Sequence, residues 1–116
     1  MFFSASALNW INPATTEELD VILNDTSKPL IVFKHSTRCS ISGFALKQFE
    51  REYDLQDVNL VFIDVLKQRE LSNHIAEKWN IVHQSPQTLI QRTSGEHTSF
   101  SHEGIAVSRI KQFLGL

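Results

Sequence analysis

The sequence contains only one cysteine, Cys39, in 116 residues. A single cysteine excludes an intramolecular disulfide framework and suits a protein of a reducing compartment. It also excludes dithiol redox chemistry, because the position three after Cys39, where a dithiol enzyme has its second thiol, is Ser42. We therefore expect either monothiol chemistry at Cys39 or no thiol chemistry at all.

Strong charge and long apolar segments are also lacking. The formal net charge of −2 gives no electrostatic basis for binding nucleic acid or an anionic membrane. The start at residues 1–4 lacks the basic segment and long apolar core of a signal peptide, and we expect no membrane span. Repeats, linkers and low-complexity segments are missing as well. We expect one domain over residues 1–116, present as a monomer in the cytoplasm.

What the sequence does contain is a change of hydrophobic period around Cys39. Residues 30–33 are a continuous apolar run after a Ser-Lys-Pro turn, which is typical of a strand buried on both faces. From residue 41 the spacing becomes three and four, which predicts a helix with one apolar face. That face comprises Ile41, Phe44, Ala45, Phe49 and Tyr53. Cys39 should then lie at the helix N-terminus, where unpaired N–H groups and the helix dipole favour an anion such as a thiolate.

Arg38 and His35 are the cations that we expect near this thiol. Helix N-termini and adjacent cations lower the pKa of a cysteine, and the thiolate is the nucleophilic form. A free cysteine is also commonly a small buried hydrophobe. We favour the reactive interpretation, because a strand-to-helix turn is an exposed end and the residues around Cys39 are polar.

The rest of the chain alternates between helix and strand patterns. We expect a short edge strand at residues 8–11, a helix of about ten residues from the capping box at residues 15–18, and a buried strand at residues 59–65. We then expect a helix at residues 70–79 that Asn80 terminates, a strand beginning at Pro86, a hairpin turn within residues 92–97 and a terminal helix at residues 105–114. The Ser85–Pro86 bond is a candidate cis peptide. This order is the layout of a thioredoxin-like α/β fold, with a central mixed sheet of four to five strands flanked by helices.

Two motifs make the resemblance more specific. They are residues 34–42, Lys-His-Ser-Thr-Arg-Cys-Ser-Ile-Ser, and residues 79–87, which end in Ser-Pro-Gln. Together they resemble the YtxJ-like monothiol bacilliredoxins, over nearly all of the chain. Arg38 and Ser40 depart from that family's pattern, which has threonine and proline there. Without the proline the helix start should be looser, whereas the arginine should strengthen thiolate stabilisation.

The resemblance implies a monothiol disulfide reductase that acts under oxidative stress. Its substrates would be mixed disulfides between client proteins and bacillithiol, a low-molecular-weight thiol of certain bacteria. The Cys39 thiolate would attack the bacillithiol sulfur, release the client thiol and carry bacillithiol until a second thiol molecule regenerates it. Bacillithiol is then a co-substrate, S-thiolated proteins are the partners, and no cofactor is bound.

Supporting roles follow for residues near Cys39. Ser42 would donate a hydrogen bond to the sulfur, and Pro86, if cis, would place the Ser85 backbone beside Cys39 to pair with an extended substrate. The alternatives are that Ser42 is an ordinary helix N-terminal residue, Pro86 a strand starter and His35 a surface imidazole. Gln87 matches the family without a clear role.

Three other functions stay open at this point. A non-catalytic adaptor with a thioredoxin-like fold would need no reactive Cys39. A monothiol glutaredoxin would use glutathione or an iron–sulfur cluster, but its typical Cys-Gly-Phe-Ser sequence is absent. A metal site at His97, His102 and Glu103 is weak, because the spacing is not that of zinc ligands.

Overall fold

The computed structural model describes residues 8–116. The helices are α1 (Thr16–Asn24), α2 (Ser40–Glu52), α3 (Arg69–Trp79) and α4 (Val107–Leu114), with a short 3-10 turn, η1 (His102–Gly104). The strands are β1 (Leu30–His35), β2 (Asn59–Asp64), β3 (Gln87–Gln91) and β4 (His97–Ser101). None of the helices in this part of the chain is long and apolar enough to cross a membrane. The segment at residues 1–4, where we expect no signal peptide, lies outside the described residues.

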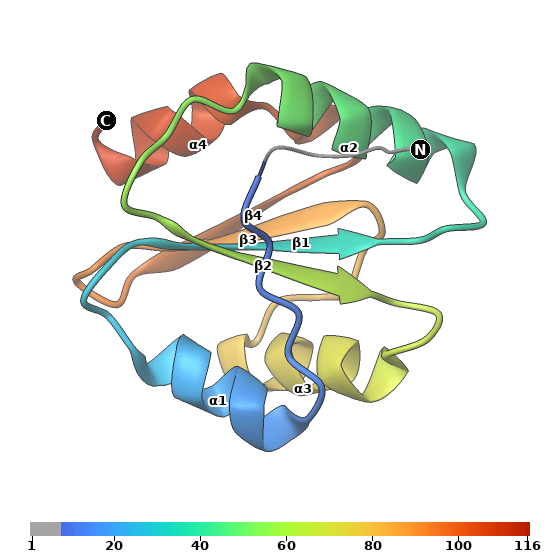
Figure 1. The fold of residues 1–116 in the computed structure, drawn as a ribbon, viewed down its shortest axis with the longest axis horizontal. Helices are drawn as coiled ribbons and strands as arrows, with labels where there is room; N and C mark the ends of the chain where they lie inside the picture. The colour runs from blue at the N-terminus through green and yellow to red at the C-terminus, as the bar shows by residue number, and fades with distance from the viewer. Residues whose placement is uncertain (1–7) are drawn as a thin grey trace.

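The four strands form one mixed sheet in the order β2-β1-β3-β4. β1 and β2 are parallel, whereas β3 is antiparallel to both β1 and β4. Figure 1 shows α1 and α3 on one face of the sheet and α2 and α4 on the other. This arrangement confirms the predicted α/β fold with a flanked mixed sheet.

β1 is the central element of the core, as its continuous apolar run predicts. All six of its residues are buried. Leu30 and Val32 belong to the apolar cluster shared with α1 and α3, whereas Ile31 and Phe33 belong to the cluster shared with α2 and α4. Side chains of a strand alternate between the two faces of a sheet. A strand covered by helices on both faces therefore needs apolar residues at successive positions.

Several predicted element ends are confirmed by their contacts. Thr15 caps α1 by accepting a hydrogen bond from the Glu18 N–H (3.1 Å), and the Glu18 carboxylate accepts one from the Ala14 N–H (2.9 Å). Asn80 ends α3 in the left-handed conformation, with φ 55°. Gly95, with φ 94°, forms the turn between β3 and β4. Glycine enters this region of φ without a steric cost.

The predicted edge strand at residues 8–11 is reduced to one parallel bridge between Ile11 and Val61. The Ile11 N–H donates to the Leu60 carbonyl (2.7 Å), and the Ile11 carbonyl accepts from the Phe62 N–H (2.9 Å). Continuing this parallel ladder would require an N–H at residue 13. That residue is Pro13, which has no N–H, so the pairing stops.

Candidate active site

Cys39 is the N-cap residue of α2 and is half-buried. Its N–H donates to the Ser36 carbonyl (3.2 Å), which closes the loop after β1, and its carbonyl accepts from the Gly43 N–H (3.1 Å). The side chain makes no capping hydrogen bond, so the sulfur is not used to satisfy the helix end. The first N–H groups of α2 and the positive end of its dipole are at this residue. The predicted position of the thiol is confirmed.

The first turn of α2 presents a different face to the sheet from the one that hydrophobic spacing predicts. Ser42 is fully buried, whereas Ile41 is 58% exposed and Phe44 is 74% exposed. The Ser42 hydroxyl accepts a hydrogen bond from the Ser36 N–H (3.0 Å) and is 2.8 Å from Nδ1 of His35. Because both partners belong to the end of β1 and its loop, these bonds fix the start of α2 on the sheet. The expected hydrogen bond from Ser42 to the Cys39 sulfur is not formed, since the hydroxyl is directed to His35 and Ser36 instead.

His35 has a different role from the expected one. Its side chain is buried between Ser42 and the ring of Phe62, whose centroid is 5.6 Å away. Burial lowers the pKa of His35, and the nearby Asp64 and Glu50 carboxylates oppose this only in part. His35 is therefore a neutral hydrogen-bond partner of Ser42 at neutral pH. It is neither the expected cation near Cys39 nor a surface imidazole.

Arg38 directly precedes Cys39 and has an exposed side chain. Among residues 8–116 it makes no hydrogen bond and no ion pair, although other surface arginines such as Arg92 do. Of the two expected cations, Arg38 is thus the one that is free to interact with an anion at the thiol. It replaces the threonine of the family pattern.

The Ser85–Pro86 bond is cis. Lys34 of β1 lies opposite Gln87 of β3, so Pro86 is at the end of β1 from which the Cys39 loop starts. The Pro86 carbonyl accepts a hydrogen bond from the His102 N–H of η1 (3.0 Å). The Ser85 hydroxyl oxygen is buried and has no hydrogen-bond partner among the described residues. Buried polar atoms nearly always have a partner, so this hydroxyl is an exception within the fold.

No sequence pattern indicates this unpaired hydroxyl, or the exposed apolar side chains that lie close to it along the chain. Val82, in the loop that leads to Ser85, is 79% exposed. With Ile41 and Phe44 it places large apolar side chains on both segments that approach the thiol end of the sheet. We call Ile41, Phe44 and Val82 the apolar rim. A hydropathy pattern alone assigns such residues to the core.

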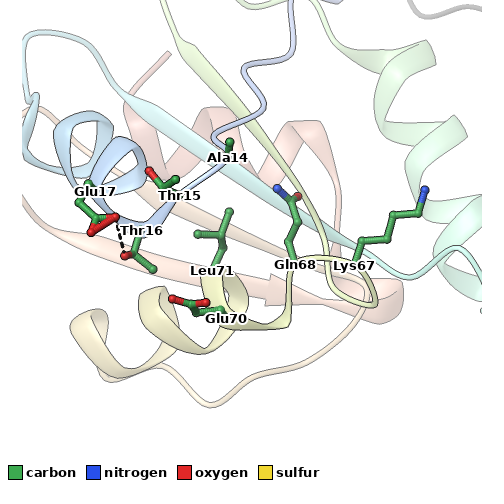
Figure 2. A pocket seen from close by; sticks show the side chains of 8 residues that line it. All are labelled: Ala14, Thr15, Thr16, Glu17, Lys67, Gln68, Glu70 and Leu71. Atoms are coloured by element: carbon green, nitrogen blue, oxygen red, sulfur yellow. Dashed lines mark hydrogen bonds between the residues drawn. The ribbon is translucent and has the colours of Figure 1, made fainter.

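A pocket of about 280 Å³ lies elsewhere, between the N-terminal ends of α1 and α3 (Figure 2). Its lining includes Lys67 and Gln68 but also the carboxylates of Glu17 and Glu70, and it does not include Cys39. We therefore do not assign the thiol chemistry to this pocket. Within residues 8–116, no three His, Cys, Asp or Glu side chains are grouped so that they could hold a metal ion. His97 instead stacks on Trp79, with ring centroids 4.7 Å apart.

Comparison with known proteins shows which family this chain belongs to. The family model of the monothiol bacilliredoxin BrxC matches residues 12–110. The chain belongs to the monothiol bacilliredoxin family. A solved protein with a thioredoxin fold, described as a candidate oxidoreductase, is 31% identical, with a TM-score of 0.75 and coverage of 88% of this chain and 90% of that one. This bacilliredoxin is thus a thioredoxin-like oxidoreductase.

More distant structures show the fold alone. The thioredoxin of Malassezia sympodialis is 13% identical, with a TM-score of 0.66 and coverage of 98% of this chain and 95% of that chain. The thioredoxin of Fasciola hepatica is 17% identical, with a TM-score of 0.65 and coverage of 90% and 95%. The predicted thioredoxin-like fold of this bacilliredoxin is confirmed.

Proposed function

We propose that this bacilliredoxin removes bacillithiol from mixed disulfides with client proteins, and that Cys39 is its nucleophile. The observation that carries the proposal is the position of Cys39 at the N-terminus of α2, in a chain that has no second cysteine. Membership of the monothiol bacilliredoxin family supports the choice of bacillithiol as the thiol. The motifs at residues 34–42 and 79–87 favour its YtxJ-like branch.

The reaction consists of two thiol–disulfide exchanges. In the first, the Cys39 thiolate attacks the bacillithiol sulfur of the mixed disulfide, a new sulfur–sulfur bond forms, and the client cysteine leaves as a thiolate. In the second, the thiolate of another bacillithiol attacks the bacillithiol sulfur bound to Cys39. This step releases the Cys39 thiolate and bacillithiol disulfide. Since a resolving cysteine is absent, the second thiol must come from outside the protein.

The neighbouring residues have separate roles in this proposal. Arg38 and the N-terminal end of α2 stabilise the Cys39 thiolate electrostatically. Ser42, held by His35, keeps the first turn of α2 against the end of β1. The Ser85 backbone, next to Pro86, pairs with an extended stretch of the client.

The apolar rim supplies the contact with the client protein. Ile41, Phe44 and Val82 are largely exposed although each is apolar, and apolar surface near a functional group commonly serves binding. We propose that these side chains contact apolar residues beside the thiolated cysteine of the client. The protein would act as a monomer in the cytoplasm, with bacillithiol as co-substrate and without a bound cofactor.

A comparison of wild type with Cys39→Ser tests the proposal. A client carrying bacillithiol on one cysteine is incubated with each protein, and release of the client thiol is followed by mass. Wild type should release it, whereas the serine variant should not, although its circular dichroism should match that of wild type. Release by the serine variant would show that Cys39 is not the nucleophile. A client carrying glutathione, tested in parallel, separates a bacilliredoxin from a glutaredoxin.

A further inference from the structure

Residues 81–84, in the loop between α3 and β3, are held by a buried side chain of β3. Gln87 is 1% exposed, and its amide makes two hydrogen bonds to this loop. The Nε2 group donates to the Val82 carbonyl (3.0 Å), and Oε1 accepts from the Gln84 N–H (3.3 Å). The next residues along the chain are Ser85 and Pro86. Gln87 therefore fixes the backbone that leads into the proposed client-binding segment.

A second buried side chain, Lys34 of β1, holds His83, the residue between Val82 and Gln84. Lys34 is fully buried, and its Nζ group donates to the Ser72 carbonyl of α3 (2.9 Å). The same Nζ lies 3.3 Å from Nδ1 of His83. An ammonium group can only donate, so Nδ1 of His83 is the acceptor and carries no proton. The Ser72 hydroxyl lies 3.2 Å from Nδ1 of His83 and can donate a hydrogen bond to the same nitrogen.

Lys34 and Gln87 are directly opposite each other in the register of β1 and β3. The side chains of this cross-strand pair thus hydrogen-bond to three successive loop residues, Val82, His83 and Gln84. Within residues 8–116 Lys34 has no carboxylate partner. Burying an ammonium group without an opposite charge costs free energy, and an apolar residue of similar size avoids that cost. A contribution to stability therefore does not account for a lysine at this position.

We propose that Lys34 and Gln87 are positioning residues for thiol exchange, and that they hold residues 82–84 so that the Ser85 backbone meets the client disulfide at the correct place. This inference rests on the proposed function. Neither side chain is hydrogen-bonded to the Cys39 sulfur, and both act through the loop. A displacement of about 1 Å in a substrate-positioning segment can cost up to about a hundredfold in rate.

The test compares two reactions of the same thiol. Alkylation of Cys39 by iodoacetamide does not need the 82–84 loop, whereas exchange with a bacillithiolated client does. In Lys34→Met and in Gln87→Met, we expect kcat/KM for the client to fall about tenfold or more, with the alkylation rate within twofold of wild type. Because the two residues hold one loop, the double variant should lose little more than either single variant. A loss equal to the product of the two single losses would contradict a shared role.

Two further variants separate positioning from loss of stability. Ile110→Ala removes core contacts in α4, on the face of the sheet opposite α3 and in a different apolar cluster from the one that Ile81 joins, and should lower the melting temperature without slowing client exchange. His83→Leu removes the loop acceptor of Lys34 at an exposed residue. It should reproduce the Lys34→Met defect even if a methionine in the core prevents folding. If His83→Leu and Gln87→Met exchange with the client at the wild-type rate, the proposal is wrong.

Hydrogen–deuterium exchange tests the same inference without any activity. The amide protons of residues 82–86 should exchange faster in Lys34→Met, Gln87→Met and His83→Leu than in wild type, with β2 and α4 unchanged. Unchanged protection of the loop would overturn the positioning role. A wild type that fails to react with the client, although loop protection changes as expected in the variants, would overturn the proposed function and support only the hold of Lys34 and Gln87 on the loop.

Discussion

The Nζ group of Lys34 lies 3.3 Å from Nδ1 of the exposed residue His83. The Lys34 side chain is itself fully buried and has no carboxylate partner among residues 8–116. Burial lowers the pKa of Lys34 from 10.5 to about 8. The folded protein therefore loses this proton at a lower pH than the unfolded chain does. This difference links the stability of the fold to pH.

The free energy of unfolding should rise between pH 8 and pH 10. In this range the unfolded chain binds the Lys34 proton more than the folded protein does, so raising the pH favours the folded state. The gain is about 2 to 3 kcal/mol from this group, and it is lost again as the pH falls through 8. Tyr53, whose pKa burial raises to about 12, has the opposite effect, but only above pH 10.

Urea unfolding of wild type and Lys34→Met at intervals from pH 7.5 to pH 10 measures this effect. The other titrating groups are common to both proteins, so the difference between the two curves isolates Lys34. Wild type should gain stability relative to the methionine variant across this range. A difference that stays constant with pH would show that Lys34 is charged throughout.

Arg38→Thr should slow the alkylation of Cys39 at pH 7 by about twofold to fivefold, the size expected for an exposed charge at a helix end. The guanidinium is exposed and unpaired among the described residues, so its effect on the thiolate should also vanish in 1 M salt. Arg51→Thr is the matched control, because Arg51 is an exposed arginine in the last turn of the same helix. Equal rates for Arg38→Thr and wild type at low salt would mean that Arg38 does not act on the sulfur.

Ser40→Pro should stabilise the protein by about 0.4 to 1 kcal/mol. Ser40 is the first residue of α2, where an N–H has no intrahelical acceptor and proline is favoured. Cys39 before it has φ −107° and ψ 118°, a conformation that a following proline permits. Thermal unfolding should show a melting temperature higher by a few degrees, and Ser40→Ala controls for loss of the hydroxyl. A lower melting temperature for the proline variant would indicate that the first turn of α2 differs from the one described.

Phe44→Ser should raise the KM for a bacillithiolated client by roughly threefold to tenfold, if the apolar rim contacts the client. Phe44 is 74% exposed, so the melting temperature should hardly change. Val21→Ser is the matched control, since Val21 is 72% exposed but lies on α1, on the opposite face of the sheet. An equal effect of both substitutions, or no effect of Phe44→Ser, would exclude the rim as the client contact.

The fold was largely predictable because its strongest signals are local. The continuous run in β1, the capping box of α1 and the left-handed Asn80 each depend on a few adjacent residues. The length of the first extended segment was less certain, since one residue, Pro13, decides where the ladder to β2 stops. The position of Cys39 followed from a change in period that is visible in the sequence.

The surroundings of Cys39 were harder to predict, because they depend on contacts between distant residues. Ser42 is buried, and Ile41 and Phe44 are exposed, because His35 and Ser36 satisfy the Ser42 hydroxyl. A prediction from hydrophobic periodicity treats serine as a polar residue and assigns it to the solvent-exposed face of the helix. Likewise, nothing in the sequence near Lys34 indicates that its side chain is buried against residues 72 and 83.

Intact-protein mass spectrometry of wild type mixed with a bacillithiolated client tests the central claim most directly. The account predicts that the mass of one bacillithiol moves from the client to Cys39, while the client thiol is released. Added bacillithiol should then remove the adduct and restore the free protein. If no adduct forms on Cys39 with this client, or if only oxidised glutathione forms one, the assignment of this chain as a bacillithiol-specific reductase is wrong.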